Sequence, residues 1–122
     1  RIEVSRRMEL ADSILATGFP YNRTSDENSN IREFSNFLYK CRGLRRFGSA
    51  ALDLAYVACG RLDGFWERGL KPWDVAAGGL IVEEGGGMVS NYEGNIWNFR
   101  RDDIIASNGN IHNSMISIIN NL

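Results

Sequence analysis

The order of short apolar segments constrains the fold more than any other feature of this sequence. Segments with the length and composition of strands alternate with segments of helical periodicity along nearly the whole chain. Glycine follows several of the helical segments, where a helix end favours it. This alternation predicts an α/β layered domain. We expect strands within 13–20, 44–47, 62–67, 87–91 and 103–107, and helices within 30–41, 50–59, 74–84 and 111–122.

Length and charge narrow the possible functions. With 122 residues, 43% of them hydrophobic and 24% charged, the chain is long enough for one globular domain. Its 14 basic and 15 acidic residues give a net charge of -1, so we expect no direct binding to nucleic acid. The longest apolar run, 50–58, is interrupted by Asp53 and is far shorter than the roughly 20 residues of a membrane span. We therefore expect no membrane segment.

The two cysteines indicate a reducing environment. Cys41 and Cys59 have apolar neighbours, and neither has a second cysteine or a histidine at metal-ligand spacing. We expect both to be free, buried thiols, and we expect a cytoplasmic location for the protein. The chain opens with Arg-Ile-Glu-Val, so we also expect it to be a fragment of a longer protein.

The strongest chemical signal lies in residues 73–87. Asp74 stands directly before a run of small and aliphatic residues, which is the position of a helix N-cap. A capping carboxylate is ionised and held in place, so its second oxygen could also bind a hard cation such as Mg²⁺. Both interpretations remain open and can hold together. The three glycines at 85–87 permit a tight turn into the next strand.

Two other segments could lie beside Asp74 in one crevice of the fold. Glu67 ends an expected strand, and functional groups in α/β sheets gather at the carboxyl ends of strands. It is either a solvated surface acid or a partner of Asp74. Gly48, Ser49 and Ala50 form a strand-to-helix turn whose amides could meet an anion or a hydroxyl.

The remaining candidates favour structural roles. The single histidine, His112, has no fixed acid, cysteine or histidine partner nearby in the sequence, so we expect it at the surface. We expect Trp66, Trp73 and Trp97 in the core or an interface. The glycosylation pattern that starts at Asn22 is expected to be a chance match. The sequence contains neither a Gly-x-Ser-x-Gly elbow nor a phosphate-binding Gly-x-x-x-x-Gly-Lys loop.

Taken together, these segments resemble a known enzyme family. The motifs are Trp73-Asp74-x-Ala76-Ala77-Gly78, Arg46-Phe47-Gly48-Ser49-Ala50-Ala51, and Glu67 seven residues before Asp74. They resemble the inositol monophosphatase family of Mg²⁺-dependent, lithium-sensitive phosphatases, and in particular its bacterial extragenic-suppressor type. Residues 15–20 and 104–108 also resemble the family's strands in the right order. The resemblance implies a layered sandwich in which a mixed sheet is flanked by helices, as in the C-terminal domain of the inositol monophosphatase and fructose bisphosphatase-like fold.

The resemblance also implies roles for individual residues. It makes Asp74 a metal ligand and Glu67 the acceptor for a hydroxyl of the inositol ring, while Gly48, Ser49 and Ala50 line the substrate pocket. The family's other metal ligands belong to an N-terminal half, and nothing in this sequence matches them. Residues 1–122 are therefore expected to form the C-terminal α/β domain, without the N-terminal metal-binding half.

The implied function is hydrolysis of inositol monophosphate to inositol and phosphate by a metal-activated water, with Mg²⁺ as cofactor. The partner is then a small phosphate monoester, and the complete protein is expected to be a homodimer. Related phosphatases act on fructose bisphosphate or adenosine bisphosphate, and a non-catalytic module that interacts with transcription machinery is a further alternative. Because one carboxylate holds Mg²⁺ weakly, we expect the 122-residue chain alone to be inactive.

Overall fold

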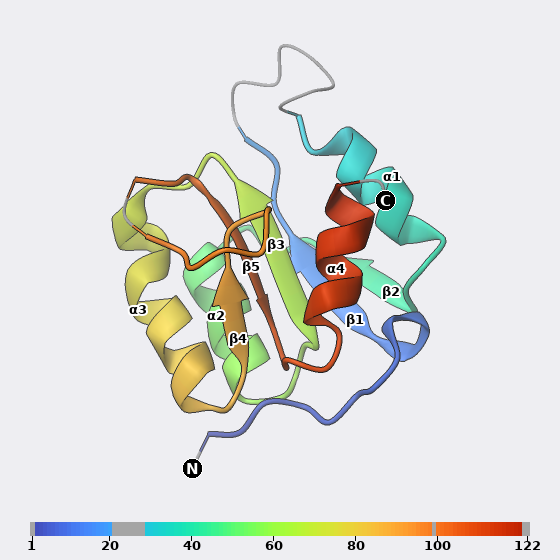
Figure 1. The fold of residues 1–122 in the computed structure, drawn as a ribbon, viewed down its shortest axis with the longest axis horizontal. Coiled ribbons are helices and arrows are strands. Elements are labelled where there is room, and N and C mark those ends of the chain that lie inside the picture. The colour runs from blue at the N-terminus through green and yellow to red at the C-terminus, as the bar shows by residue number, and fades with distance from the viewer. Residues whose placement is uncertain (1, 21–28, 99, 121–122) are drawn as a thin grey trace.

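The computed structural model describes residues 2–20, 29–98 and 100–120, in which helices and strands alternate (Figure 1). Strands 14–17 and 64–68 and helices 50–58 and 72–84 lie close to the expected ranges, and the strand at 103–107 has the expected bounds. In chain order the elements are η1 (Leu10–Asp12), β1 (Ile14–Thr17), α1 (Ile31–Leu38), β2 (Gly43–Arg45), α2 (Ala50–Ala58), β3 (Gly64–Arg68), α3 (Pro72–Glu84), β4 (Met88–Ser90), β5 (Asp103–Ser107) and α4 (His112–Ile119).

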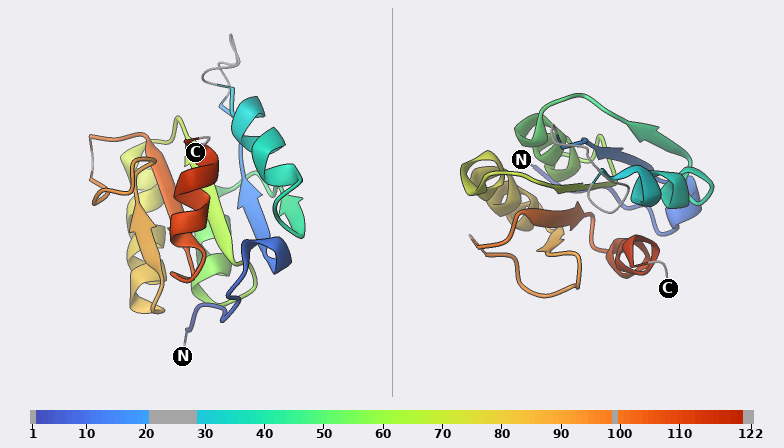
Figure 2. Two further views of the ribbon diagram at one scale, coloured as in Figure 1. Left: turned by 45° about the vertical axis from the view of Figure 1, so that its right-hand side comes forward. Right: turned by 90° about the horizontal axis from the view of Figure 1, so that it is seen from above.

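The five strands form one mixed sheet, in the order β2-β1-β3-β5-β4. Strand β1 runs parallel to both β2 and β3, while β5 is antiparallel to β3 and β4. The helices cover both faces, with α2 and α3 on one side and α1 and α4 on the other (Figure 2). The expected α/β layered sandwich with a mixed sheet is confirmed.

Alternate residues of the strands supply two apolar cores, one on each face. Ala16 and Phe65 pack under α2 and α3, whereas Leu15 and Trp66 pack under α1 and α4. Side chains on a strand point alternately to the two faces, which is why β1, β3 and β5 each contribute to both cores. Helix α3 approaches α2 closely at Gly78, where an added Cβ would lie 2.7 Å from Cδ1 of Leu54.

His112 is not at the surface as expected. Its ring is 1% exposed and lies between Ser90 of β4 and Ser107 of β5, each with a hydroxyl 2.8 Å from one ring nitrogen. Serine is a frequent surface residue, so these distant partners gave no signal in the sequence. Because both nitrogens have partners, the ring can be buried without leaving an unpaired polar atom.

The prediction for the cysteines is correct in one respect and wrong in another. Both are free, but Cys59 is exposed and Cys41 is half-buried. The buried residues of helix α2 include Leu54, Val57 and Ala58. Cys59 lies just past the end of that helix and is therefore no longer on its buried face. Cys41 follows α1, which stops at Leu38 because the chain turns there to pair with the sheet.

The tryptophans occupy three different environments. Trp66 is fully buried and stacks near Phe37, with ring centroids 4.2 Å apart. Trp97 is half-buried and packs against the core beside α2 and α3. Trp73 is 75% exposed, so the expectation of a core or interface position is not met for it within this chain. The pattern at Asn22 lies outside the described residues.

No helix in the described part of the chain is both long and apolar enough to cross a membrane.

Candidate functional site

A pocket of about 510 Å³ opens where two parallel strands end and two helices begin. Strands β1 and β3 end at one edge of the sheet, and the first turns of α2 and α3 lie beside that edge. The expected crevice at the carboxyl ends of strands is therefore present. Its lining residues are Thr17, Gly18, Phe19, Arg46, Gly48, Ser49, Ala50, Ala51, Asp53, Glu67, Leu70, Trp73 and Asp74.

Glu67 and Asp74, which the sequence placed in one crevice, both line this pocket. Glu67 is half-buried on β3, and its pKa is raised to about 7. Burial is the largest cause, the negative charges of Asp53 and Asp74 add to it, and the positive charge of Arg46 opposes it. Glu67 is thus a partly desolvated acid that interacts electrostatically with two other carboxylates, those of Asp53 and Asp74.

Asp53 is a third acid at the pocket, and the sequence reasoning missed it. It lies in the first turn of α2 with 1% of its surface exposed, and its Oδ1 has no hydrogen-bond partner among the described residues. Burial raises its pKa to about 6. The available signal was a single acid inside an otherwise apolar helix, since such an acid is rarely buried without a reason.

Asp74 lies at the third position of α3 and not at the N-cap. Pro72 takes the first helical position, where its fixed φ and missing N–H suit a helix start. The helix therefore begins earlier than expected, with Lys71 at the N-cap. The Asp74 carboxylate still serves the helix end, because Oδ2 accepts a hydrogen bond of 3.2 Å from the backbone N–H of Lys71.

The turn before α2 brings its three predicted residues to the pocket. Ser49 is the N-cap, and its Oγ accepts a 3.2 Å hydrogen bond from the backbone N–H of Leu52. Gly48 has φ +83°, a conformation that favours glycine. Gly48, Ser49 and Ala50 all line the pocket, so the structure brings all five predicted site residues together.

The described residues do not form a complete metal site. No group of three or more histidines, cysteines or acids among them could hold a metal ion. Asp74 is exposed at the pocket and offers one carboxylate with an oxygen besides the one that accepts from Lys71. Oxygen is the ligand type that Mg²⁺ prefers, and one or two carboxylates with several waters are common for it. The residues present therefore fit a partial Mg²⁺ site.

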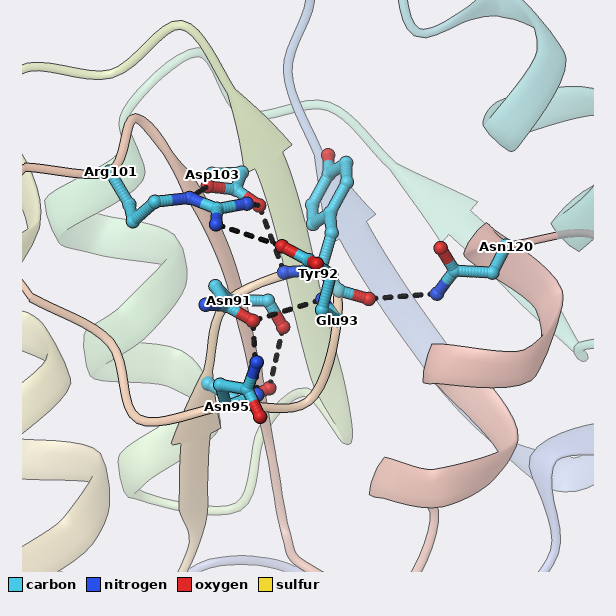
Figure 3. Close-up of polar contacts among 8 residues, drawn as sticks. Asn91, Tyr92, Glu93, Asn95, Arg101, Asp103 and Asn120 are labelled. Carbon is cyan, nitrogen blue, oxygen red and sulfur yellow. Dashed lines mark hydrogen bonds and ion pairs between the residues drawn. The ribbon is translucent and has the colours of Figure 1, made fainter.

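A second polar cluster, on the loop after β4, contains an acid with a structural role, Asp103, which can be compared with the pocket acids (Figure 3). Both oxygens of Asp103 accept from Arg101 at 2.8 Å, and Oδ2 also accepts from the backbone N–H of Tyr92 at 2.9 Å. Burial opposes ionisation of Asp103, but these hydrogen bonds outweigh it and lower the pKa. Asp53 and Glu67 show the opposite shift, which is typical of acids at functional sites.

Known proteins share this sequence and fold. The chain is 48% identical over 114 residues to an inositol-1-monophosphatase of Synechocystis, covering 93% of the chain and 40% of that relative. It is 40% identical over 121 residues to the Nus factor SuhB of Pseudomonas aeruginosa, covering 98% of the chain and 45% of that relative. The chain thus spans less than half the length of these relatives.

Solved structures agree with this result. An inositol monophosphatase from Anabaena matches with a TM-score of 0.95 and 45% identity, covering 99% of the chain and 48% of that structure. The extragenic suppressor protein SuhB from Bartonella henselae matches with a TM-score of 0.90 and 45% identity, over 98% of the chain and 46% of that structure. A sequence model described as the inositol monophosphatase family matches residues 1–122. The chain belongs to the inositol monophosphatase family.

Proposed function

We propose that residues 1–122 are the C-terminal part of a magnesium-dependent phosphatase that hydrolyses inositol monophosphate to inositol and phosphate. The observation that carries the proposal is the gathering of Asp53, Glu67 and Asp74 around one pocket. They come from α2, β3 and α3, so only the fold brings them together. The family membership and the two relatives named as inositol monophosphatases support the same reaction.

Electrostatics favour a cation at this pocket. Three carboxylates repel one another, and the raised pKa of Glu67 reflects the charges of Asp53 and Asp74 in addition to burial. A divalent cation would relieve this repulsion, and Asp74 would hold it through its exposed carboxylate. Bound Mg²⁺ would supply a water of lowered pKa and neutralise charge on the phosphoryl group. Its other ligands would come from residues outside the part of the chain that the structure describes.

Glu67 is suited to the polyol part of the substrate. A cation at the pocket would favour the ionised form of Glu67, and an ionised carboxylate accepts strongly from hydroxyl groups. Partial burial strengthens such a hydrogen bond. The turn at Gly48, Ser49 and Ala50 would form the wall beside it, with Ser49 kept in place by its capping bond to Leu52. The relative position of Glu67 and Asp74 would then place the ring on one side of the pocket and the phosphate nearer the cation.

The substrate assignment is tested with Glu67→Gln in the complete protein. Loss of a charge-assisted hydrogen bond should reduce transition-state stabilisation on inositol phosphate by roughly 1.5 to 3 kcal/mol, which is measured as a fall in kcat/KM. A small phosphate ester without ring hydroxyls should lose far less. The quantity to measure is the ratio of the two losses in kcat/KM, because the ratio cancels general damage to folding or metal binding. Equal losses would mean that Glu67 acts on the metal site or the fold.

The same assay separates sibling substrates. Fructose bisphosphate and adenosine bisphosphate are the alternatives, and the order of kcat/KM among the three esters decides between them. The 122-residue chain alone should release no phosphate above background at any Mg²⁺ concentration, since Asp74 is the one exposed carboxylate among the described residues that line the pocket. Turnover by the purified chain, with contaminating phosphatases excluded, would contradict the partial-site argument.

A non-catalytic function is the second candidate. Several matched relatives carry the name Nus factor SuhB, among them those of Pseudomonas aeruginosa and Escherichia coli. Assay of the complete protein for Mg²⁺-dependent phosphate release distinguishes an enzyme from a module that acts only through transcription machinery. The homodimer and the cytoplasmic location belong to the same proposal, and the free thiols Cys41 and Cys59 are compatible with that location.

A further inference from the structure

The carboxylate of Glu67 lies directly against the backbone of Gly18. Thr17 of β1 pairs with Trp66 of β3, so the residues that follow them, Gly18 and Glu67, are neighbours at the sheet edge. A Cβ added at position 18 would lie 2.5 Å from Oε1, 2.7 Å from Cδ and 2.8 Å from Oε2 of Glu67. The carboxylate therefore occupies the space that any other residue at position 18 would fill.

The backbone conformation does not by itself require glycine here. Gly18 is not among the glycines with positive φ, so an alanine could adopt its backbone angles. The three nearest atoms to an added Cβ all belong to the end of the Glu67 side chain. The end of a side chain moves more easily than a paired strand, so a methyl group at position 18 should displace the carboxylate and leave the sheet in place.

A buried asparagine fixes Gly18 in this position. Nδ2 of Asn30 donates to the Gly18 carbonyl at 2.8 Å and to Thr17 Oγ1 at 2.9 Å, while Oδ1 accepts from Trp66 Nε1 at 2.8 Å. Thr17 Oγ1 in turn donates to the Trp66 carbonyl. Asn30 is buried and has φ 73°, a conformation that asparagine tolerates better than most residues. One side chain thus ties together the residues before both Gly18 and Glu67.

We propose that Gly18, held by Asn30, is a positioning residue that sets the place of the Glu67 carboxylate for binding a hydroxyl of the substrate. The proposal rests on the proposed role of Glu67, and it adds the reason why the carboxylate occupies one position.

The first test compares structures and does not depend on activity. Crystal structures of the complete protein and of its Gly18→Ala variant should show the same sheet, with the Glu67 carboxylate moved away from position 18. A carboxylate that stays in place while the strands separate would overturn the proposal. Failure of the variant to fold would overturn it as well, because the backbone would then yield before the side chain.

The second test is a double-mutant cycle. Gly18→Ala should lower kcat/KM on inositol phosphate roughly tenfold or more, the size of a lost charge-assisted hydrogen bond, and lower it far less on a small ester without ring hydroxyls. In a Glu67→Ala background the same change should have an effect below about twofold, because the displaced group is gone. If Gly18→Ala lowered kcat/KM by the same factor with Glu67 and in the Glu67→Ala background, the proposal would be contradicted.

A matched control is available on α3. At Gly79 an added Cβ meets only Val89, at 3.8 Å, so Gly79→Ala introduces the same methyl group without displacing a side chain. This variant should keep the kcat/KM values on inositol phosphate and on the small ester, and so the ratio between them. If the unaltered protein shows no phosphatase activity, the proposed function fails while the crystal structures still decide the placement of Glu67. If it is active and Gly18→Ala retains the full preference for inositol phosphate, the positioning role alone fails.

Discussion

Acid should weaken the contribution that one buried side chain, His112, makes to the stability of this chain. Burial lowers the pKa of His112 from 6.5 to about 4 and is the sole cause of the shift. Between these two pH values the unfolded chain binds a proton at this position and the folded chain does not. The contribution of His112 to the free energy of unfolding should therefore fall as the pH is lowered from 6.5 to 4, whereas Asp53 and Glu67, whose pKa values are raised, contribute in the opposite direction. The difference between the two pKa values corresponds to about 3 kcal/mol, a large part of a small domain's stability.

The hydrogen bonds explain why the proton is unfavourable in the folded state. The hydroxyl of Ser90 donates to the carbonyl of Asn91, so its oxygen accepts from Nε2–H of His112. On the other side, Ser107 Oγ accepts from the N–H of Gly109, and its hydroxyl is free to donate to Nδ1. The neutral ring has a complete set of partners in this arrangement. A proton on Nδ1 would face the Ser107 hydroxyl proton and add a buried charge.

The histidine is the single one in the sequence, so its NMR signal needs no assignment. Its titration should give a pKa near 4 in the folded chain and near 6.5 in urea. Urea unfolding of the chain and of a His112→Gln variant should then be compared from pH 4 to 7. Both proteins contain the same acidic residues, so the pH dependence that these acids cause cancels in the comparison. The stability difference should shrink by about 3 kcal/mol towards pH 4. A constant difference, or titration near 6.5 in the folded chain, would refute the reasoning.

Two further substitutions test the helices around the pocket. Asp74→Asn keeps an oxygen that can accept from Lys71 but removes the charge, so the activity of the complete protein with Mg²⁺ should fall by orders of magnitude while thermal unfolding shows a change of about 1 kcal/mol or less; a collapse of stability with normal activity per folded molecule would make Asp74 a structural residue. Gly78→Ala should destabilise the chain by about 1 to 3 kcal/mol in urea unfolding, because the new methyl group overlaps Leu54, whereas Gly79→Ala should be nearly neutral; equal effects would contradict the close packing of α2 and α3.

The fold was predictable because its signals are local. Apolar runs of strand length, helical periodicity and helix-ending glycines each depend on neighbouring residues, and all five strands and four helices lie close to the expected ranges. The errors have two causes. α1 stops before residue 41 because the following residues pair with β1, which is distant in the sequence. α3 starts at Pro72, a local signal for the first helical position, and so begins before the acid that had been assigned to its cap.

The site was predictable only in part. The family motifs name Glu67, Asp74 and the turn at 48–50, and the fold brings them to one pocket. Neither Asp53 nor Gly18 has a local signal of this kind. Asp53 was visible merely as a charge in an apolar run, and its role at the pocket depends on how α2 lies against β3. Gly18 ends a strand like many glycines, and its contact with Glu67 depends on the register of β1 and β3.

The pocket acids and the buried histidine illustrate two different uses of burial. At His112 the fold supplies two hydroxyl partners, so the neutral ring is satisfied and its only effect is on stability. At the pocket Asp53 Oδ1 has no hydrogen-bond partner among the described residues, and Glu67 lies close to two like charges, which destabilises the ionised folded chain. Such unfavourable placement persists in proteins mainly where a ligand compensates for it. Under the proposed function a cation and a polyol would supply the two missing interactions, positive charge for the acids and a hydroxyl donor for Glu67, and this is the physical reason to propose the function at this pocket.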